Sequence, residues 1–371
     1  MAYSAVMKQA IGTVRATLAN QGIGMQDARF ARHGAHEPDA DAPLVLVACS
    51  GGRDSLALAA VAATVCAAWG VRCGAVVVDH RMQPGSADVA AQAARRCAAL
   101  GLDPVVVRDV RVVDEHGEGG EAAARDARYA ALVDEARRLG AAVVLLAHTK
   151  DDQAESVLID LIRSGGLDAI AGMPAEQRID GVCFARPLLG LARAETTRIC
   201  EDLGLAWWDD PTNGDAFPAD EELPARFPLR SRVRHTLLPY LSAFAGRDMA
   251  TMLADGAALA RRDVDLLERL TDDVFARSVR IEDDGRGLRA SIDVRALAKE
   301  DAALRFRVVA RTLALCAPGS GRRHVEAVEA LISDWHGQRG VQLPRKRTAN
   351  RQKHVIEVCE DVTHANRRHR G

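Results

Sequence analysis

The sequence predicts an α/β protein: a doubly wound, mostly parallel sheet of five strands, followed by a mainly helical domain and a small C-terminal mixed α/β piece. Apolar runs of strand length alternate with helical patterns between residues 44 and 190. Such alternation favours a parallel sheet with helices on both faces. Polar clusters at 50–55, 79–81 and 148–152 each follow an apolar run. Ligands bind at these strand ends in parallel sheets. After residue 190 helical patterns dominate.

Five apolar runs define the expected sheet, and turn residues bound each of them. The predicted strands are 44–48, 71–78, 104–108, 142–147 and 182–185. Apolar residues at helical spacing predict the intervening helices, several of which end at a glycine. These helices are 4–20, 56–70, 87–100, 121–139 and one that follows residue 152 and ends near 163.

The remaining chain indicates helices at 192–203, from 239 to about 270, and in two segments within 292–335. Strand-like pieces within 341–358 flank the basic turn Arg345-Lys346-Arg347, and the chain ends in a basic tail at 367–371. We therefore expect three regions. They are an N-terminal helix and lead-in at 1–40, an α/β domain at 41–215, and a mainly helical region at 216–371 that ends in the small basic piece.

Composition and cysteine usage indicate a globular protein in a reducing compartment. The chain has 371 residues, 48% hydrophobic and 27% charged, with a net charge of −2. Any nucleic-acid surface must therefore come from local basic patches. The eight cysteines form no C-x-x-C pair and show no zinc-ligand spacing. Since the N-terminus also carries no contiguous apolar signal, we expect a soluble, cytoplasmic protein without membrane association. A homodimer stays open.

The stretch from Ser50 to Ser55 has the features of a phosphate-binding loop. Gly51 and Gly52 follow an apolar strand and precede a helix, so backbone amides and the helix dipole favour an anion there. Arg53 lies within the loop, and Ser55 can cap the helix. A carboxylate at Asp54 repels phosphate unless it holds Mg²⁺. The alternatives are an ordinary strand–helix turn and, for Asp54, a helix N-terminal acid.

Six motifs, in order over about 200 residues, narrow the class of phosphate-binding protein to which the chain can belong. They are SGGRDS (50–55), VVVDHRMQPGSADVA (76–90), EAAARDARYAAL (121–132), AHTKDDQAES (147–156), ARPLLGLARAE (185–195), and DDPTN (209–213) with LRSRVRHTLLPYL (229–241). The first resembles the signature of the PP-loop ATP pyrophosphatases, whose fold is the HUP-like, adenine nucleotide alpha hydrolase-like one. Together they resemble the tRNA(Ile)-lysidine synthases. Ser231 stands where that family usually has Asn.

This resemblance implies a ligase that uses ATP and Mg²⁺. Its substrates would be free L-lysine and the isoleucine tRNA with a CAU anticodon. The C2 oxygen of the wobble cytidine attacks the α-phosphorus, pyrophosphate leaves, and the lysine amine then replaces AMP to give lysidine. The product reads AUA instead of AUG, and the identity of the tRNA changes from methionine to isoleucine.

The resemblance also assigns roles to the polar clusters. Residues Ser50 to Ser55 would hold ATP, with Asp54 as metal ligand. Residues Val78 to His80 would border the adenine or the ribose, with a plain strand end as the alternative for Asp79 and His80. His148 would contact phosphate, or else lie in the core. Asp152 and Glu155, three residues apart on one helix face, would bind the substrate lysine, with capping as the alternative.

Two arginine groups complete the predicted site. Arg125, with Arg128 three residues on, would contact phosphate, cytidine or the substrate carboxylate, and we include it among the catalytic candidates with Asp54, Asp152 and Glu155. Four arginines would contact the tRNA backbone: Arg226, Arg230, Arg232 and Arg234. A solvated charged face is the alternative for both groups.

Other functions are compatible with the first loop alone. A tRNA thiolase or an amidotransferase-linked synthetase would also use this loop. Thiolases of this kind commonly carry paired cysteines, which this chain does not have, and no glutaminase domain precedes the loop. A non-catalytic nucleotide- or RNA-binding module is the third hypothesis, and Asp54 with the acidic pair argues against it.

Overall fold

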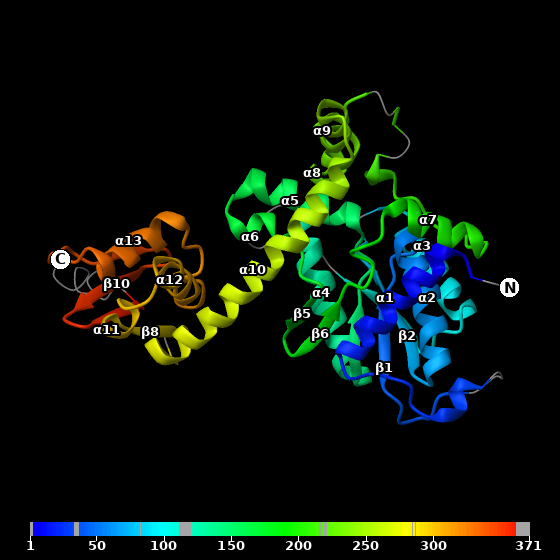
Figure 1. Ribbon diagram of the computed structural model, residues 1–371, viewed down its shortest axis with the longest axis horizontal. Helices are drawn as coiled ribbons and strands as arrows, with labels where there is room; N and C mark the ends of the chain where they lie inside the picture. The colour runs from blue at the N-terminus through cyan, green and yellow to red at the C-terminus, as the bar shows by residue number, and fades with distance from the viewer. Residues whose placement is uncertain are drawn as a thin grey trace. The chain divides into compact units, whose positions relative to one another are not determined.

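A computed structural model describes residues 3–32, 37–81, 83–110, 120–214, 217–218, 221–283, 285 and 287–360, with side chains from 123 onward in the fourth range. The chain divides into two compact units, residues 1–261 and 262–371 (Figure 1). The boundaries that the sequence suggests at 40 and 215 stay predictions. Most of the predicted loop at 109–120 and the basic tail at 367–371 lie outside the described residues.

The first unit is built on a sheet of six strands in the order β3-β2-β1-β4-β6-β5. Five strands are parallel, and β5 pairs with β6 in the antiparallel sense. The predicted count of five was therefore one too low. Their bounds are β1 Leu44–Ala48, β2 Arg72–Asp79, β3 Val105–Asp109, β4 Ala141–Leu145, β5 Glu176–Ile179 and β6 Val182–Ala185.

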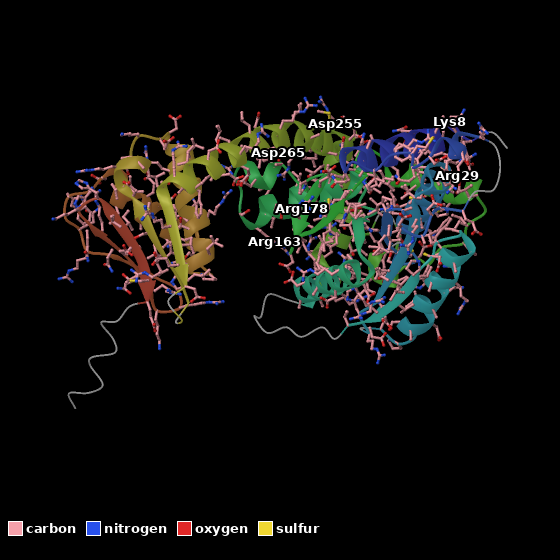
Figure 2. All side chains as sticks on the ribbon, turned by 90° about the horizontal axis from the view of Figure 1, so that it is seen from below. Lys8, Arg29, Arg163, Arg178, Asp255 and Asp265 are labelled. Carbon is pink, nitrogen blue, oxygen red and sulfur yellow. The ribbon has the colours of Figure 1, made fainter. Side chains whose placement is uncertain are left out.

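Helices cover both faces of this sheet, as the doubly wound prediction requires. One buried cluster joins β1 to α1, α2, α3 and α7, and a second cluster packs α4 on the opposite face. The helices of this region are α1 Ala5–Asn20, η1 Ala28–Ala31, α2 Arg53–Trp69, α3 Ser86–Ala99, α4 Gly120–Leu139, α5 Lys150–Arg163, α6 Leu167–Ile170, α7 Arg193–Asp202 and η2 Pro211–Asn213. Figure 2 marks charged side chains on several of these elements, including Lys8 on α1 and Arg163 at the end of α5.

The arginine-rich segment forms one interrupted helix: α8 (Leu229–Arg232), the π-helix η3 (Val233–Leu237) and α9 (Leu238–Ala245). Pro239 explains the interruption, because proline has no N–H and its ring clashes with the carbonyl four residues earlier. Val233 and Leu238 pack this segment against α5. On α9, Tyr240 and Phe244 are 63% and 81% exposed and stack with ring centroids 6.3 Å apart.

The second unit has its own core between helices and an antiparallel sheet of order β7-β8-β11-β10-β9. Helix α10 (Met249–Ser278) leads into it from the first unit. The other elements are β7 Val279–Asp283, β8 Leu288–Asp293, α11 Val294–Leu297, α12 Ala302–Cys316, α13 Arg322–Ser333, β9 Val341–Leu343, β10 Arg347–Gln352 and β11 Val355–Glu360. The sequence predicted the two helices and the last strands but not β7 and β8.

Within the described residues, no helix combines the length and the apolar character needed to cross a bilayer. All eight cysteines are free thiols, and seven of them are buried.

Candidate active site

The turn between β1 and α2 forms the predicted phosphate loop. Its backbone turns at Gly51, whose φ is +82°, and a Cβ there would lie 2.9 Å from the Cβ of Ala93. Glycine is therefore required by both conformation and space. The N-cap of α2 is Gly52, with no side-chain cap, so the first amides of the helix have no acceptor within it. The loop can donate these amides to an anion.

Ser55 stabilises the loop from inside rather than capping the helix. Its Oγ accepts a hydrogen bond from the Ser50 amide at 3.2 Å and donates one to the Gly52 carbonyl at 2.9 Å. The segment after α7 closes over the same loop, since the Trp208 amide donates to the Gly51 carbonyl at 3.0 Å. Arg53 pairs with Asp209 at 2.6 Å, so the loop and this segment are linked twice.

A pocket of about 870 Å³ opens beside the loop, large enough for a nucleotide. All its lining residues belong to the first unit. Most of the predicted site residues line it, among them Ser50, Asp54, His148, Asp152, Arg125 and Arg230. Val78 instead packs against the core under α4, and Arg226 and Arg232 lie on the exposed surface. Gly51 and Glu155 belong to the elements beside the pocket but are not among its lining residues.

The acidic pair at the start of α5 combines the two roles that the sequence left open. Asp152 completes a capping box, because its Oδ2 accepts from the Thr149 amide at 2.8 Å. The same carboxylate lies 3.2 Å from Arg193. Burial opposes ionisation of Asp152, but Arg193 and the other cations around it lower its pKa to about 2. Asp152 is therefore a fixed negative charge in the pocket.

Glu155 is the most enclosed charge of the site, with no exposed side-chain surface. Arg234 binds it through two hydrogen bonds, of 2.6 Å from Nε and 3.0 Å from Nη2. Arg193 and Arg230 approach it at 3.5 and 3.6 Å. Two of the four arginines predicted for tRNA, Arg230 and Arg234, thus lie in the pocket as partners of the acids.

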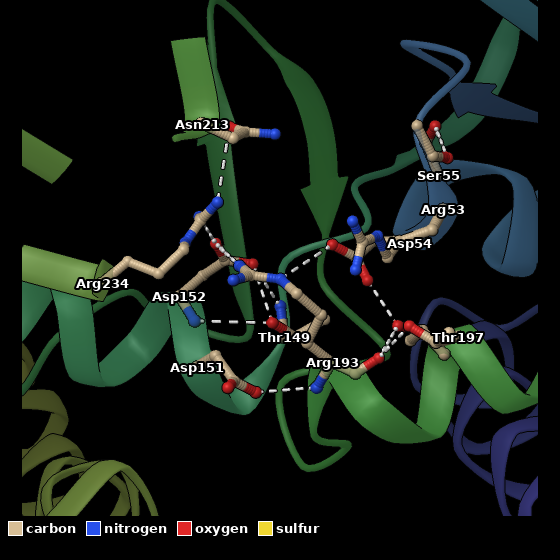
Figure 3. A network of polar contacts seen from close by, with 12 residues as sticks. Arg53, Asp54, Ser55, Thr149, Asp151, Asp152, Arg193, Thr197, Asn213 and Arg234 are labelled. Carbon is tan, nitrogen blue, oxygen red and sulfur yellow. Dashed lines mark hydrogen bonds and ion pairs between the residues drawn. The ribbon is translucent and has the colours of Figure 1, made fainter. Parts of the chain in front are cut away.

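Asp54 faces the pocket from the first turn of α2, where the metal prediction placed it. The Thr196 hydroxyl donates to its Oδ1, and Arg193 Nε lies 3.5 Å from its Oδ2. Burial raises its pKa above the ordinary range, while Arg193 and Thr196 oppose that shift. Figure 3 shows Arg193 between Asp54 and Asp152. Arg193 belongs to the motif at 185–195, but its position in the sequence alone predicts no role for it.

Two histidines line the pocket with unsatisfied buried atoms. Among the described residues, the Nδ1 atoms of His80 and His148 have no hydrogen-bond partner. Burial lowers the pKa of both rings, for His148 to about 3. Neutral imidazoles with free nitrogens can bond to polar atoms of a ligand.

Arg125 and Arg128 reach the pocket from α4, and both lie over the ring of Tyr129 at 5.3 and 5.8 Å. Burial, together with neighbouring arginines, lowers the pKa of Arg128. Guanidinium groups held this close to one another favour an anionic ligand.

The donor set fits a nucleotide and a metal carried by it. Within the residues that the structure describes, no three metal-binding side chains cluster. Mg²⁺ commonly uses one or two carboxylates together with waters and substrate phosphates. Asp54 at the mouth of the phosphate loop provides such a carboxylate, and the buried histidine atoms offer contacts to the nucleotide.

This fold and loop define the class: a nucleotide-binding α/β protein with the phosphate loop of the PP-loop proteins. A family model described as "PP-loop domain" matches residues 26–241, and one described as "TilS substrate binding domain" matches 292–355. Two relatives named "tRNA(Ile)-lysidine synthase" are similar along most of the chain. The one from Bifidobacterium animalis subsp. lactis is 59% identical over 99% of both chains. The one from Streptomyces coelicolor is 43% identical over 84% of both.

The chain belongs to the tRNA(Ile)-lysidine synthase family. Among solved structures, a U34-tRNA thiolase from Methanococcus maripaludis is similar with a TM-score of 0.49 and 16% identity, covering 69% of this chain and 78% of that one.

Proposed function

We propose that this protein ligates L-lysine to C2 of the wobble cytidine in the CAU-anticodon isoleucine tRNA, with ATP as the activating substrate. The observation that carries the proposal is a single pocket that combines a phosphate loop with the carboxylates of Asp54 and Asp152. The cytidine C2 oxygen bonds to the α-phosphorus and pyrophosphate leaves. The lysine amine then bonds to C2, loses a proton, and AMP leaves with the oxygen. The reaction belongs in the cytoplasm, where both substrates are available.

The phosphate loop would bind the triphosphate through the first backbone amides of α2. Asp54 would hold Mg²⁺, which would supply charge neutralisation for the phosphate groups. Arg125 and Arg128 are placed to bind anionic groups at the α4 side of the pocket. Because positioning and charge neutralisation dominate such transfers, these residues would account for most of the rate in the first step.

Asp152 and Glu155 would bind the cationic substrate lysine. Both are buried carboxylates, and Asp152 keeps its charge at neutral pH because its pKa is about 2. His148, whose pKa is about 3, is neutral at that pH and adds no competing charge. An amine must be neutral to attack C2, and burial among arginines favours loss of its proton.

The tRNA would lie along exposed arginines. Arg226 and Arg232 are exposed on the segment that also supplies Arg230 and Arg234 to the pocket. Because one segment carries both the exposed arginines and the pocket arginines, a tRNA backbone bound to the exposed ones would lie close to the pocket. We retain Arg230 and Arg234 as tRNA candidates that also hold the acids in place.

One assay separates the candidate functions. ATP, lysine and the tRNA are incubated with the protein, and the modified nucleoside is identified by mass. Lysidine, with pyrophosphate release that needs both lysine and tRNA, is the expected result. Sulfur incorporation without lysine would favour a thiolase, and ATP binding without cleavage would favour a binding module.

Asp54→Ala tests the metal role directly. We expect turnover to fall by at least about a hundredfold with an unchanged fold, because a positioned charge is lost from the transferring phosphate. Thr197→Ala on α7 is the matched control, since the Thr197 hydroxyl donates to the Arg193 carbonyl within its own helix. Turnover of Asp54→Ala close to that of the wild type would remove Asp54 from the mechanism.

A further inference from the structure

Arg193 connects the two proposed subsites of the pocket. It is the first residue of α7, and its guanidinium lies 3.5 Å from Asp54, 3.2 Å from Asp152 and 3.5 Å from Glu155 (Figure 3). Asp54 belongs to the proposed nucleotide subsite, and the other two acids belong to the proposed lysine subsite. One cation therefore occupies the space between both.

The acids depend on Arg193 to different degrees. Glu155 has a second partner, since Arg234 binds it with two short hydrogen bonds. Among the described residues, the nearest cation to both Asp54 and Asp152 is Arg193. An ammonium group that enters beside Asp152 would meet this guanidinium at close range, and like charges at such a distance repel.

The guanidinium is shared among several carboxylates, while the backbone is fixed by one short hydrogen bond. Its three ion pairs are each longer than 3.1 Å and are spread over three carboxylates. The Arg193 amide, by contrast, donates to Asp151 Oδ2 at 2.7 Å, which fixes the start of α7. The side chain can thus change partners without movement of the helix.

An alternative partner lies within reach. Asp54 is the second residue of α2, so an arginine that contacts Asp54 is next to the helix N-terminus that would hold the triphosphate. Phosphate oxygens bind guanidinium groups through strong charge-assisted hydrogen bonds.

We propose that Arg193 is a positioning residue whose guanidinium lies at the lysine-ammonium position before nucleotide binds and moves to the triphosphate when nucleotide binds. ATP binding thereby opens the amino-acid subsite, and lysine binds tightly only to the nucleotide complex. This inference rests on the proposed function. It predicts reciprocal coupling, because each ligand must raise the affinity of the other by the same factor.

Calorimetry of lysine binding tests the coupling, with and without Mg²⁺ and α,β-methylene-ATP, which cannot release pyrophosphate. In the wild-type protein we expect lysine to bind at least about tenfold more tightly in the presence of the analogue. In Arg193→Met we expect the two affinities to agree within about threefold. Nucleotide-free lysine should then bind more tightly to the variant than to the wild type, because the competing cation is gone.

Two further variants define the result. Arg193→Lys keeps a cation at the end of a shorter side chain and should retain part of the coupling. Arg198→Met is the matched control, since Arg198 lies on the same helix with a 64% exposed side chain and pairs with Asp202. It should behave as the wild type.

The proposal is overturned if the wild-type protein binds lysine equally well with and without the analogue, or if Arg193→Met keeps tenfold coupling. The wild-type comparison and its reciprocal, nucleotide affinity with and without lysine, do not depend on the folding of any variant. Lysidine formation by a wild-type protein without coupling would refute this inference alone. Absence of lysine binding under every condition would refute the proposed function as well.

Discussion

At the scale of single residues, the site is organised by Glu155, a fully buried carboxylate that meets arginines from α7, α8 and η3. Removing one partner of a buried ion cluster leaves the other charges without a counter-charge. The resulting loss of stability is larger than the net stabilisation that the intact pair provides. The neutral isostere Glu155→Gln would leave three guanidinium groups with Asp152 and Asp54 alone.

We expect Glu155→Gln to lower the free energy of unfolding by about 3–5 kcal/mol, measured by urea denaturation. Glu201→Gln on α7 is the control, because the Glu201 side chain is 54% exposed and exposed pairs contribute little. A loss below about 1 kcal/mol in Glu155→Gln would mean that the arginines find other partners.

His148 should make the stability pH-dependent. Burial, together with the positive charges of Arg186, Arg128 and Arg230, lowers the pKa of His148 from 6.5 to about 3. The negative charge of Asp152 opposes this shift. Between pH 6.5 and about pH 3, the ring of His148 is protonated in the unfolded chain but not in the folded protein. The free energy of unfolding therefore falls as the pH decreases below 6.5. The slope from this ring is at most about 1.4 kcal/mol per pH unit.

Urea unfolding of the wild type and of His148→Gln, each at pH 7 and pH 5, measures the contribution of His148 to the pH dependence of stability. The wild type should lose more free energy of unfolding than the variant, by up to about 2 kcal/mol. Equal losses in both proteins would show that the ring is protonated in the folded state, contrary to its burial.

At the scale of elements, the turn from β1 to α2 tolerates only glycine at position 51. Gly51→Ala adds left-handed strain of about 1–2 kcal/mol and brings a Cβ to 2.9 Å from Ala93. We expect its ATP affinity to fall by at least about tenfold, measured by calorimetry, because the loop must shift. Gly101→Ala, at φ +84° with no atom of the described residues within 4 Å of the added Cβ, should keep the affinity. Similar affinities in both variants would contradict a rigid loop.

Elements with a strong apolar run could be predicted from the sequence, and weaker ones could not. The five parallel strands are buried runs flanked by turn residues, and their order along the chain indicated the site. Strand β5 reads Glu-Gln-Arg-Ile and lies at the sheet edge, where it needs no apolar run. It forms because Asp180 and Gly181, both with positive φ, close a tight hairpin onto β6.

Strands β7 and β8 show the alternating pattern of a strand, but they are short and lie between strong helical patterns, so they were not predicted. Both strands alternate apolar and polar residues. In β8, for example, Leu288, Ala290 and Ile292 are each followed by a polar residue. Likewise, sequence spacing places Arg230 and Arg234 one turn apart but cannot show which face meets solvent. Only the packing of Val233 and Leu238 on α5 turns these arginines toward the acids.

At the scale of the whole molecule, a net charge of −2 leaves RNA affinity to local arginines. Arg226 and Arg232 are exposed, unlike Arg230 and Arg234, and so offer the cleaner test of the tRNA surface. The partners of Arg193 also show the limit of sequence reasoning, because the three acids that it contacts are separated from it by at least 38 residues of chain.

We expect Arg226→Ala with Arg232→Ala to weaken tRNA binding and to flatten the plot of log affinity against log salt by about 2, one unit for each lost phosphate contact. Filter binding between 50 and 200 mM salt, about the range over which such contacts are screened, gives the slope. Arg29→Ala with Arg198→Ala removes two exposed arginines of the same unit and should leave it unchanged. An unaltered slope in the first pair would place the RNA elsewhere.

The π-helix at Val233–Leu237 lies between Arg230 and the stacked rings of Tyr240 and Phe244 in one interrupted helix. A wide turn of this kind contains one residue more than an α-helical turn, so it takes up an extra residue locally and leaves the helix beyond it in phase. An extra residue in a regular α-helical turn would instead rotate everything beyond it by about 100°. The wide turn therefore lets the aromatic rings keep their direction relative to the pocket although the segment between them is one residue longer.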